Sequence, residues 1–367
     1  MKPSRRAQAF RDVTGFEFED DPISVVDLDE TGWLIDSVTR ESVPSVALRD
    51  HFAEQFAPPS WATDLFVYVH GWQTSPDSAV RAATRLRTLM LTRRRQAERS
   101  GFYPGLAATG FEPWMLVVRW PSASGPGPIG YRRIRARAHA MGSRPGNGHA
   151  AHVIGRLLGY LDTERPDPAA PALLANREGQ YLHLVAHSFG CRLLCEAVVW
   201  AAEASLGDTL CWNAATRDRV RPFTVDSMLL FQMAAPRDAF GSMFSGLAPA
   251  VAPALEPDRN PAPLRGPVVA TYSRHDHATG LWHLGAEGKL GVGHSGIDPS
   301  SVPVAETRLL PGDERYLECD LDHPFVNVDA TDGFSRGGRL NPAGAHSLHI
   351  CPESAHLLLS LADFSRP

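Results

Sequence analysis

The chain has 367 residues, and its 36 lysines and arginines against 41 aspartates and glutamates give a net charge of −5. That balance excludes a broadly basic nucleic-acid-binding protein, and a hydrophobic fraction of 43 % with 21 % charged residues excludes an intrinsically disordered chain. No apolar run reaches the roughly 18 to 20 residues that span a bilayer, and the first ten residues lack the apolar centre of a signal peptide. We therefore expect a cytoplasmic protein without a transmembrane segment.

The cysteines and histidines give no pattern typical of a disulfide framework or a metal centre. The five cysteines are widely spaced and form no CxxC pair, which indicates reduced thiols. Four histidines lie near Asp276 in the sequence, but their spacings match no standard zinc pattern: His275, His277, His283 and His294. We expect neither a metal nor an organic cofactor.

Residues 1–57 are interpreted as an N-terminal extension that contributes the opening antiparallel strands of a sheet. Two short strands are expected there, at 23–27 and 33–38, and the segment Glu30-Thr31-Gly32 between them is typical of a turn.

From Asp64 onward the pattern changes to short apolar runs that alternate with helix-like stretches. Such runs are typical of strands buried on both faces of a parallel sheet, so the fold class is α/β, with a mostly parallel central sheet flanked by helices on both faces. The expected strands are 65–69, 114–120, 182–186, 227–233, 267–272 and 325–328, and the expected helices are 78–98, 131–141, 149–161, 191–204 and 353–364. We interpret residues 58–367 as one catalytic domain with long loop insertions, of which 121–150 and 238–266 are candidate lids.

The segment 181–192, YLHLVAHSFGCR, predicts a buried strand that passes directly into a helix with Ser188 at the junction. Ala186 and Gly190 lie two residues before and two after this serine, and small residues there let strand and helix approach closely enough to expose the hydroxyl on a strained turn. Ala186 stands where the motif GxSxG has glycine, but it meets the same steric need. A helix-capping serine is the alternative interpretation.

This motif and the order of elements from 62 to 364 resemble the α/β-hydrolase superfamily, in its esterase and lipase-like branch. The segment 65–72, LFVYVHGW, looks like the family's third strand followed by its HG motif. The resemblance implies an α/β-hydrolase fold and an oxyanion hole made by the backbone N–H groups of Trp72 and Phe189, with Gly71 allowing the tight turn.

A serine hydroxyl is a weak nucleophile, so it needs a histidine base that is held in turn by a carboxylate. The superfamily has these residues in the chain order serine, acid, histidine. The resemblance places the acid at Asp276, after the strand at 267–272, and the base at His346, in the segment GAHSLH before the final helix. Less favoured candidates are Asp238, Asp329 and Asp332 for the acid, and His349 and His356 for the base.

Two literal motif matches are rejected because of their surroundings. The segment 333–337, GFSRG, fits GxSxG, but it lies in a polar stretch with no helix after it. The segment 125–130, GPGPIG, fits GxGxxG, but Pro126 and Pro128 lack the N–H groups that a pyrophosphate needs.

The resemblance therefore implies a serine hydrolase that cleaves a carboxylic ester through an acyl-enzyme, with a small-molecule or lipid ester as substrate. A thioesterase, an amidase or a phospholipase with the same triad, or a non-catalytic ligand-binding member of the fold, stay open as alternatives. Contact with a membrane surface would follow if the apolar stretch 240–255 is an interfacial lid.

Overall fold

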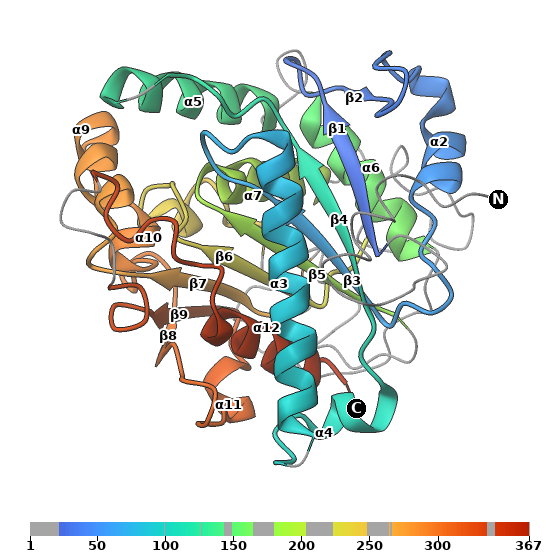
Figure 1. Ribbon diagram of the computed structural model, residues 1–367. Helices are drawn as coiled ribbons and strands as arrows, with labels where there is room; N and C mark the ends of the chain where they lie inside the picture. The colour runs from blue at the N-terminus through green and yellow to red at the C-terminus, as the bar shows by residue number, and fades with distance from the viewer. Residues whose placement is uncertain are drawn as a thin grey trace, which may run out of the picture.

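The computed structural model describes residues 22–98, 100–125, 127–142, 149–163, 180–202, 223–247, 264, 266–335 and 342–366. A nine-stranded sheet runs through them in the order β2-β1-β4-β3-β5-β6-β7-β9-β8 (Figure 1). Neighbouring strands are parallel throughout, except that β1 and β2 are antiparallel. The predicted α/β class with a mostly parallel sheet is confirmed.

The strands are β1 (Ile23–Leu28), β2 (Leu34–Ile35), β3 (Asp64–Val69), β4 (Pro113–Arg119), β5 (Tyr181–His187), β6 (Ser227–Phe231), β7 (Val268–Tyr272), β8 (Ala305–Arg308) and β9 (Phe325–Asp329). The helices are α2 (Leu48–Gln55), α3 (Pro76–Ala97), α4 (Pro104–Thr109), α5 (Gly127–Gly142), α6 (Ala150–Thr163), α7 (Phe189–Ala202), α9 (His283–Glu287), α10 (Val292–Ser295), α11 (Glu318–Leu321) and α12 (Pro352–Phe364). Short helical turns are η1 (Ser45–Ala47), η4 (Ala239–Gly241) and η6 (Ala278–Trp282). Among the described residues, no helix combines the length and apolar character that crossing a bilayer requires.

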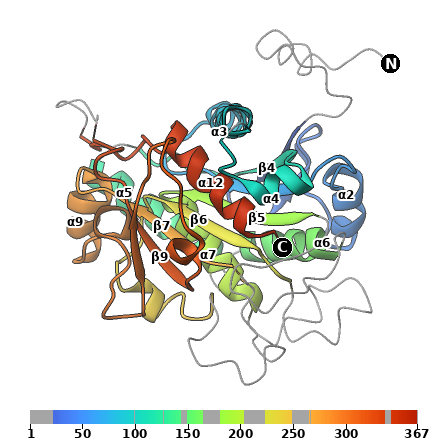
Figure 2. The same ribbon diagram turned by 90° about the horizontal axis from the view of Figure 1, so that it is seen from below.

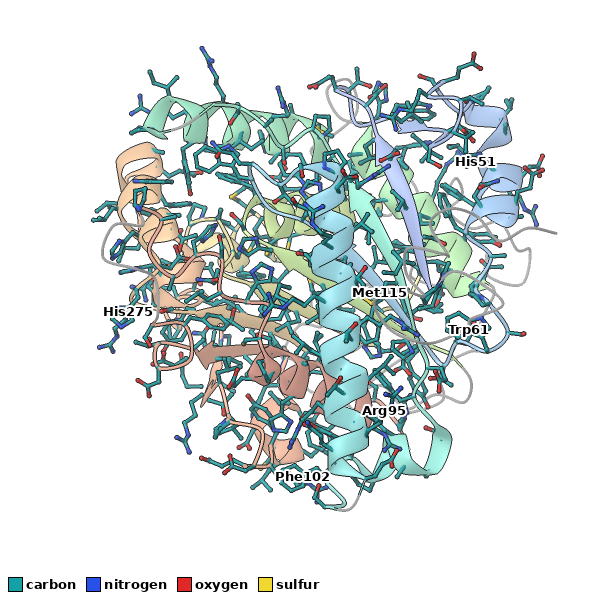
Figure 3. The ribbon with its side chains drawn as sticks, viewed as in Figure 1. His51, Trp61, Arg95, Phe102, Met115 and His275 are labelled. Atoms are coloured by element: carbon teal, nitrogen blue, oxygen red, sulfur yellow. The ribbon has the colours of Figure 1, made fainter. Side chains whose placement is uncertain are left out.

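Helices cover both faces of the sheet. Helices α3, α4 and α12 pack on one face, whereas α5, α6 and α7 pack on the other (Figure 2). Strand β3 is buried along its whole length, and its successive side chains alternate between the two cores: Leu65 and Val67 join one, Phe66 and Tyr68 the other. Met115 of β4 lies beneath α3 in the second core (Figure 3).

The loops after β3, β5, β7 and β9 leave the sheet at the same edge, because these strands are parallel. Strand β3 lies between β4 and β5, so the chain changes its direction of progress across the sheet at this point. Ligand sites of open α/β sheets form at the carboxyl ends of the strands beside such a switch.

Some elements differ from the sequence prediction. The strand expected at 33–38 ends at Ile35, because the Asp36 carboxylate accepts the N–H groups of Val38 and Thr39 and turns the chain. The strand expected at 227–233 ends at Phe231, because Gln232 has a left-handed backbone with φ of 47°. The expected helix end at 203–204 and the second half of the apolar stretch 240–255 lie outside the described residues.

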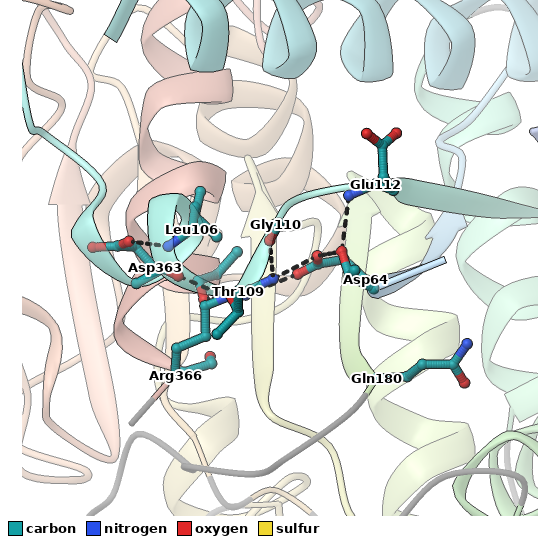
Figure 4. Close-up of polar contacts among 12 residues, drawn as sticks. Asp64, Leu106, Thr109, Gly110, Glu112, Gln180, Asp363 and Arg366 are labelled. Atoms are coloured by element: carbon teal, nitrogen blue, oxygen red, sulfur yellow. Dashed lines mark hydrogen bonds and ion pairs between the residues drawn. The ribbon is translucent and has the colours of Figure 1, made fainter. Parts of the chain in front are cut away.

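The tail that follows α12 is tied to the start of β3 by a buried ion pair (Figure 4). The Arg366 guanidinium donates to both Asp64 carboxylate oxygens, at 3.1 and 2.7 Å, and both side chains have no exposed surface. Asp363 accepts the Leu106 N–H at 2.8 Å and so joins α12 to α4. Burial would raise the pKa of Asp64, but the charge of Arg366 and hydrogen bonds from His183 and Arg366 lower it below its ordinary value.

Candidate active site

Ser188 lies on the sharp turn between β5 and α7. Its φ is 56°, a left-handed conformation that is rare for a residue with a side chain. The turn is held by β6 and the chain after it, because the Ser188 N–H donates to the Phe231 carbonyl at 3.0 Å and the Ala234 N–H donates to the Ser188 carbonyl at 3.2 Å. Strand, turn and helix therefore have the predicted arrangement around the serine.

Two glycines allow the end of β3 to approach this turn. A Cβ atom added at Gly190 would lie 2.5 Å from the Val69 carbonyl oxygen, and one added at Gly71 would lie 2.9 Å from the Ser188 Cβ. A Cβ atom essentially never lies within 3.0 Å of such a neighbour, so either substitution would force the structure to shift. The approach of the HG turn to Ser188 thus depends on the absence of both side chains.

The backbone N–H groups of Phe189 and Trp72 belong to segments that lie next to Ser188. Phe189 is the first residue of α7, and Trp72 follows Gly71 in the turn after β3. Within the described part of the chain, no acceptor pairs with either N–H. Unpaired amides beside a serine at the start of a helix are suited to bind a negative oxygen.

His70 fixes the peptide that carries the Trp72 N–H. Its Nδ1–H donates to the Gly71 carbonyl at 3.0 Å, while its Nε2 accepts the Trp120 N–H at 3.2 Å. This pair of bonds requires the neutral ring, and burial lowers the pKa of His70 to about 4.

The structure brings Ser188, His346 and Asp276 into one hydrogen-bonded chain. The Ser188 Oγ lies 2.7 Å from His346 Nε2, and His346 Nδ1 lies 2.8 Å from Asp276 Oδ2. Since the carboxylate can only accept, Nδ1 carries the proton and Nε2 is free to accept the serine hydroxyl. The three residues come from the loops after β5, β7 and β9.

Asp276 is fully buried and its carboxylate is well supplied with donors. Oδ1 accepts the Thr279 N–H at 3.0 Å, and Oδ2 accepts the Gln232 side-chain N–H at 3.2 Å in addition to His346. The Ala345 N–H donates to the His275 carbonyl at 2.9 Å, which joins the acid loop to the base loop. The relative position of acid and base is therefore fixed by backbone as well as side-chain contacts.

The less favoured candidates lie elsewhere. Asp238 forms an ion pair with Lys289, Asp329 accepts the Thr331 N–H, and Asp332 is exposed. His349 stacks on His187, and His356 lies on α12, bonded to Tyr103 and Glu314.

The histidines near Asp276 are not arranged as metal ligands. His275 and His277 are exposed, and Figure 3 shows His275 at the outer edge of the molecule. His283 and His294 donate through Nδ1 to the carbonyls of Lys289 and Asp276. Over the residues that the structure covers, no group of three or more His, Cys, Asp or Glu side chains could hold a metal ion.

The two candidate lid segments are described in part. Helix α5 occupies most of 121–150 and packs on α7 and α9, with Tyr131 placed between the rings of Phe189 and Trp72 at 4.8 and 5.8 Å. At the start of 238–266, Phe240 is buried and its ring contacts Phe325 at 5.3 Å. Residues 248–263 lie outside the described part of the chain.

Sequence reasoning missed three residues that support the site. His70 is the histidine of the HG motif and His187 adjoins Ser188, so their positions indicated that they lie close to the site, although no role was assigned to them. The position of Gln232 gave no such indication, because its neighbours in the sequence continue the apolar pattern of a strand.

Comparison with protein-family models, with curated proteins and with solved structures gives no significant match for this chain.

Proposed function

We propose that this chain is a serine hydrolase of the α/β-hydrolase fold that cleaves a carboxylic ester through an acyl-enzyme. The observation that carries the proposal is the hydrogen-bonded chain from Ser188 through His346 to Asp276, on a strained strand-to-helix turn beside two unpaired amides.

In this mechanism the Ser188 Oγ attacks the ester carbonyl as His346 Nε2 takes the hydroxyl proton. The tetrahedral oxyanion is held by the N–H groups of Trp72 and Phe189, each contributing about 3 kcal/mol to stabilisation of the transition state. The intermediate collapses as the imidazolium returns its proton to the leaving alkoxide. Water, activated by the same histidine, then releases the acid and restores the serine.

The charges of the site favour this sequence of steps. The Asp276 carboxylate is buried, so its attraction for the His346 imidazolium is only weakly screened by solvent. Burial keeps the neighbouring rings neutral, because it lowers the pKa of His70 to about 4 and that of His349 to about 3. The imidazolium therefore forms without a second positive charge beside it.

The proposal is tested by labelling with a fluorophosphonate probe and locating the adduct by peptide mass spectrometry. We expect an adduct on Ser188 and none in Ser188→Ala, whose unfolding temperature should stay close to that of the parent. The matched control is Ser335→Ala, which removes the exposed serine of the literal GxSxG match and should label normally. An adduct elsewhere, or none on folded protein, would overturn the proposal and favour a non-catalytic binding protein.

Ester specificity is tested with an ester, a thioester and an amide that share one acyl group. We expect the largest kcat/KM for the ester. A larger value for the thioester or the amide would reassign the reaction while leaving the role of Ser188 intact.

A further inference from the structure

The loop that carries His346 has two consecutive carbonyl groups that accept hydrogen bonds from side chains at the ends of β5 and β6. The Ala345 carbonyl accepts the Gln232 Nε2–H at 3.1 Å, and the His346 carbonyl accepts the His187 Nε2–H at 2.7 Å. Gln232 follows β6 and His187 ends β5. These two hydrogen bonds hold the peptide groups on both sides of the His346 Cα atom against the ends of β5 and β6.

His187 contacts the turn after β3, which carries Gly71 and Trp72, as well as the loop that carries His346. A Cβ atom added at Gly71 would lie 2.6 Å from His187 Nδ1, so the ring packs directly against this turn. On its other side the ring stacks on His349, with centroids 3.8 Å apart and planes inclined by 15°. One imidazole therefore sets the spacing between the turn that presents the Trp72 N–H and the loop that presents His346.

Gln232 contacts the acid as well as the base loop. The same Nε2 that donates to Ala345 lies 3.2 Å from Asp276 Oδ2, the oxygen that receives the His346 Nδ1–H. Both of its partners are acceptors, so the amide nitrogen rather than the oxygen faces them. Its left-handed backbone, with φ of 47°, is what turns the side chain to this position at the end of β6.

We propose that His187 and Gln232 are positioning residues that hold the catalytic histidine loop by its Ala345 and His346 carbonyls and thereby fix His346 Nε2 against the serine hydroxyl. The proposal rests on the proposed function of the site. Neither side chain touches the reacting atoms, and both donate as neutral groups. A positive donor at either place would oppose the imidazolium that forms during the reaction.

The hydrogen bond of His187 is separated from its packing by two substitutions. His187→Phe keeps the flat ring but removes the donor, whereas His187→Gln keeps a donor at nearly the same reach but removes the ring. We expect His187→Phe to slow labelling of Ser188 about 10- to 100-fold, as a small misplacement of a catalytic group does, and His187→Gln to recover most of that loss. Packing alone would give the opposite order, and this outcome would overturn the role of His187.

The second arm tests Gln232 through its link to the carboxylate. Gln232→Met keeps the length of the side chain but leaves Asp276 with one donor fewer, so the carboxylate stabilises the His346 imidazolium more strongly. We expect slower labelling, because the Ala345 carbonyl loses its donor and the loop that carries His346 is held less firmly. The stronger stabilisation of the imidazolium should also displace the acidic limb of the pH–rate profile toward higher pH. The titratable groups that surround His346 are Asp276, His187 and His349, and the substitution alters only the first of them. An unchanged rate and profile would overturn the role of Gln232.

His356→Phe is the control, because it removes the same type of bond, an imidazole Nε2–H to the Glu314 carbonyl at 2.8 Å, from a buried position on α12, together with the hydrogen bond to Tyr103. It should lower the unfolding temperature to a similar extent and leave the labelling rate unchanged. Equal slowing in this control would show that the other variants act through stability, which also overturns the proposal. Failure of the parent protein to label would instead refute the proposed function.

Discussion

Three residues near the proposed site carry backbone strain. Of the four non-glycine residues with positive φ in the described chain, Gln73 lies in the turn after β3, Ser188 is the proposed nucleophile and Gln232 donates to Asp276. Such conformations cost about 1 to 3 kcal/mol each and persist only where the surroundings enforce them. Here the backbone N–H groups of Gln73, Ser188 and Gln232 donate to the carbonyls of Ser122, Phe231 and Thr271, and these hydrogen bonds hold the strained conformations in place.

Gly190 tests how closely the residues at this edge are packed. In Gly190→Ala the new methyl group would meet the carbonyls of Val69 and His70, so either α7 or the HG turn must move. We expect a loss of about 1 to 3 kcal/mol in unfolding free energy, measured by urea denaturation, and loss of labelling at Ser188. Gly285→Ala on α9 is the control, because no atom lies within 4 Å of its added Cβ, and it should leave both measurements unchanged. Normal labelling of Gly190→Ala would contradict the close packing described above.

At the scale of elements, the buried strands were predictable and the exposed ones were not. Strands β3, β5 and β9 are apolar runs, whereas β8 has the sequence AETR, is only half-buried at Ala305 and Thr307, and shows no such run. The short helices α9 and α10 escaped prediction for a related reason, since they lie in a long polar segment and owe their position to contacts with η6 and β7. Tertiary packing, not local pattern, decides these elements.

The pair formed by Asp64 and Arg366 tests how α12 is held on the sheet. Removal of Arg366 leaves the Asp64 carboxylate without its guanidinium partner in a site with no exposed surface, so Arg366→Met should lower the unfolding free energy by about 3 to 5 kcal/mol in urea. The double variant Asp64→Asn with Arg366→Met removes both charges and should recover part of the loss. If the double variant is no more stable than the single one, the charge pair is not what holds the helix.

For the whole molecule, buried neutral histidines make stability depend on pH. Burial lowers the pKa of His356 to about 4, so between pH 6.5 and 4 the unfolded chain binds a proton at this residue that the native protein does not. The contribution of neutral His356 to the unfolding free energy is therefore complete above pH 6.5. It falls as the pH decreases, by about 2 kcal/mol from pH 7.5 to 5. His356→Gln should reduce the acid-induced drop in unfolding free energy, whereas His323→Gln, at an exposed histidine, should not. An identical pH dependence in both variants would show that His356 is not kept neutral by the fold.

The candidate site was predictable to the extent that chain order determines geometry. Parallel strands bring their carboxyl ends together, so loops that carry Ser188, Asp276 and His346 had to meet if the sheet was assigned correctly. The residues that we propose to orient these three were not predictable. His187 and Gln232 act through single hydrogen bonds to a loop more than 100 residues later in the chain, and no spacing in the sequence encodes such a contact.

The ion pair of Asp64 and Arg366 also has a consequence for the order in which the protein folds. The two residues are 302 positions apart, and Asp64 begins a strand at the middle of the sheet. This contact can form only after Arg366 has been synthesised, and until then Thr63 and His183 are the side chains that can pair with the Asp64 carboxylate. A chain shortened to residue 365 would keep Ser188, Asp276 and His346 but would lose the ion pair that joins the segment after α12 to the middle of the sheet.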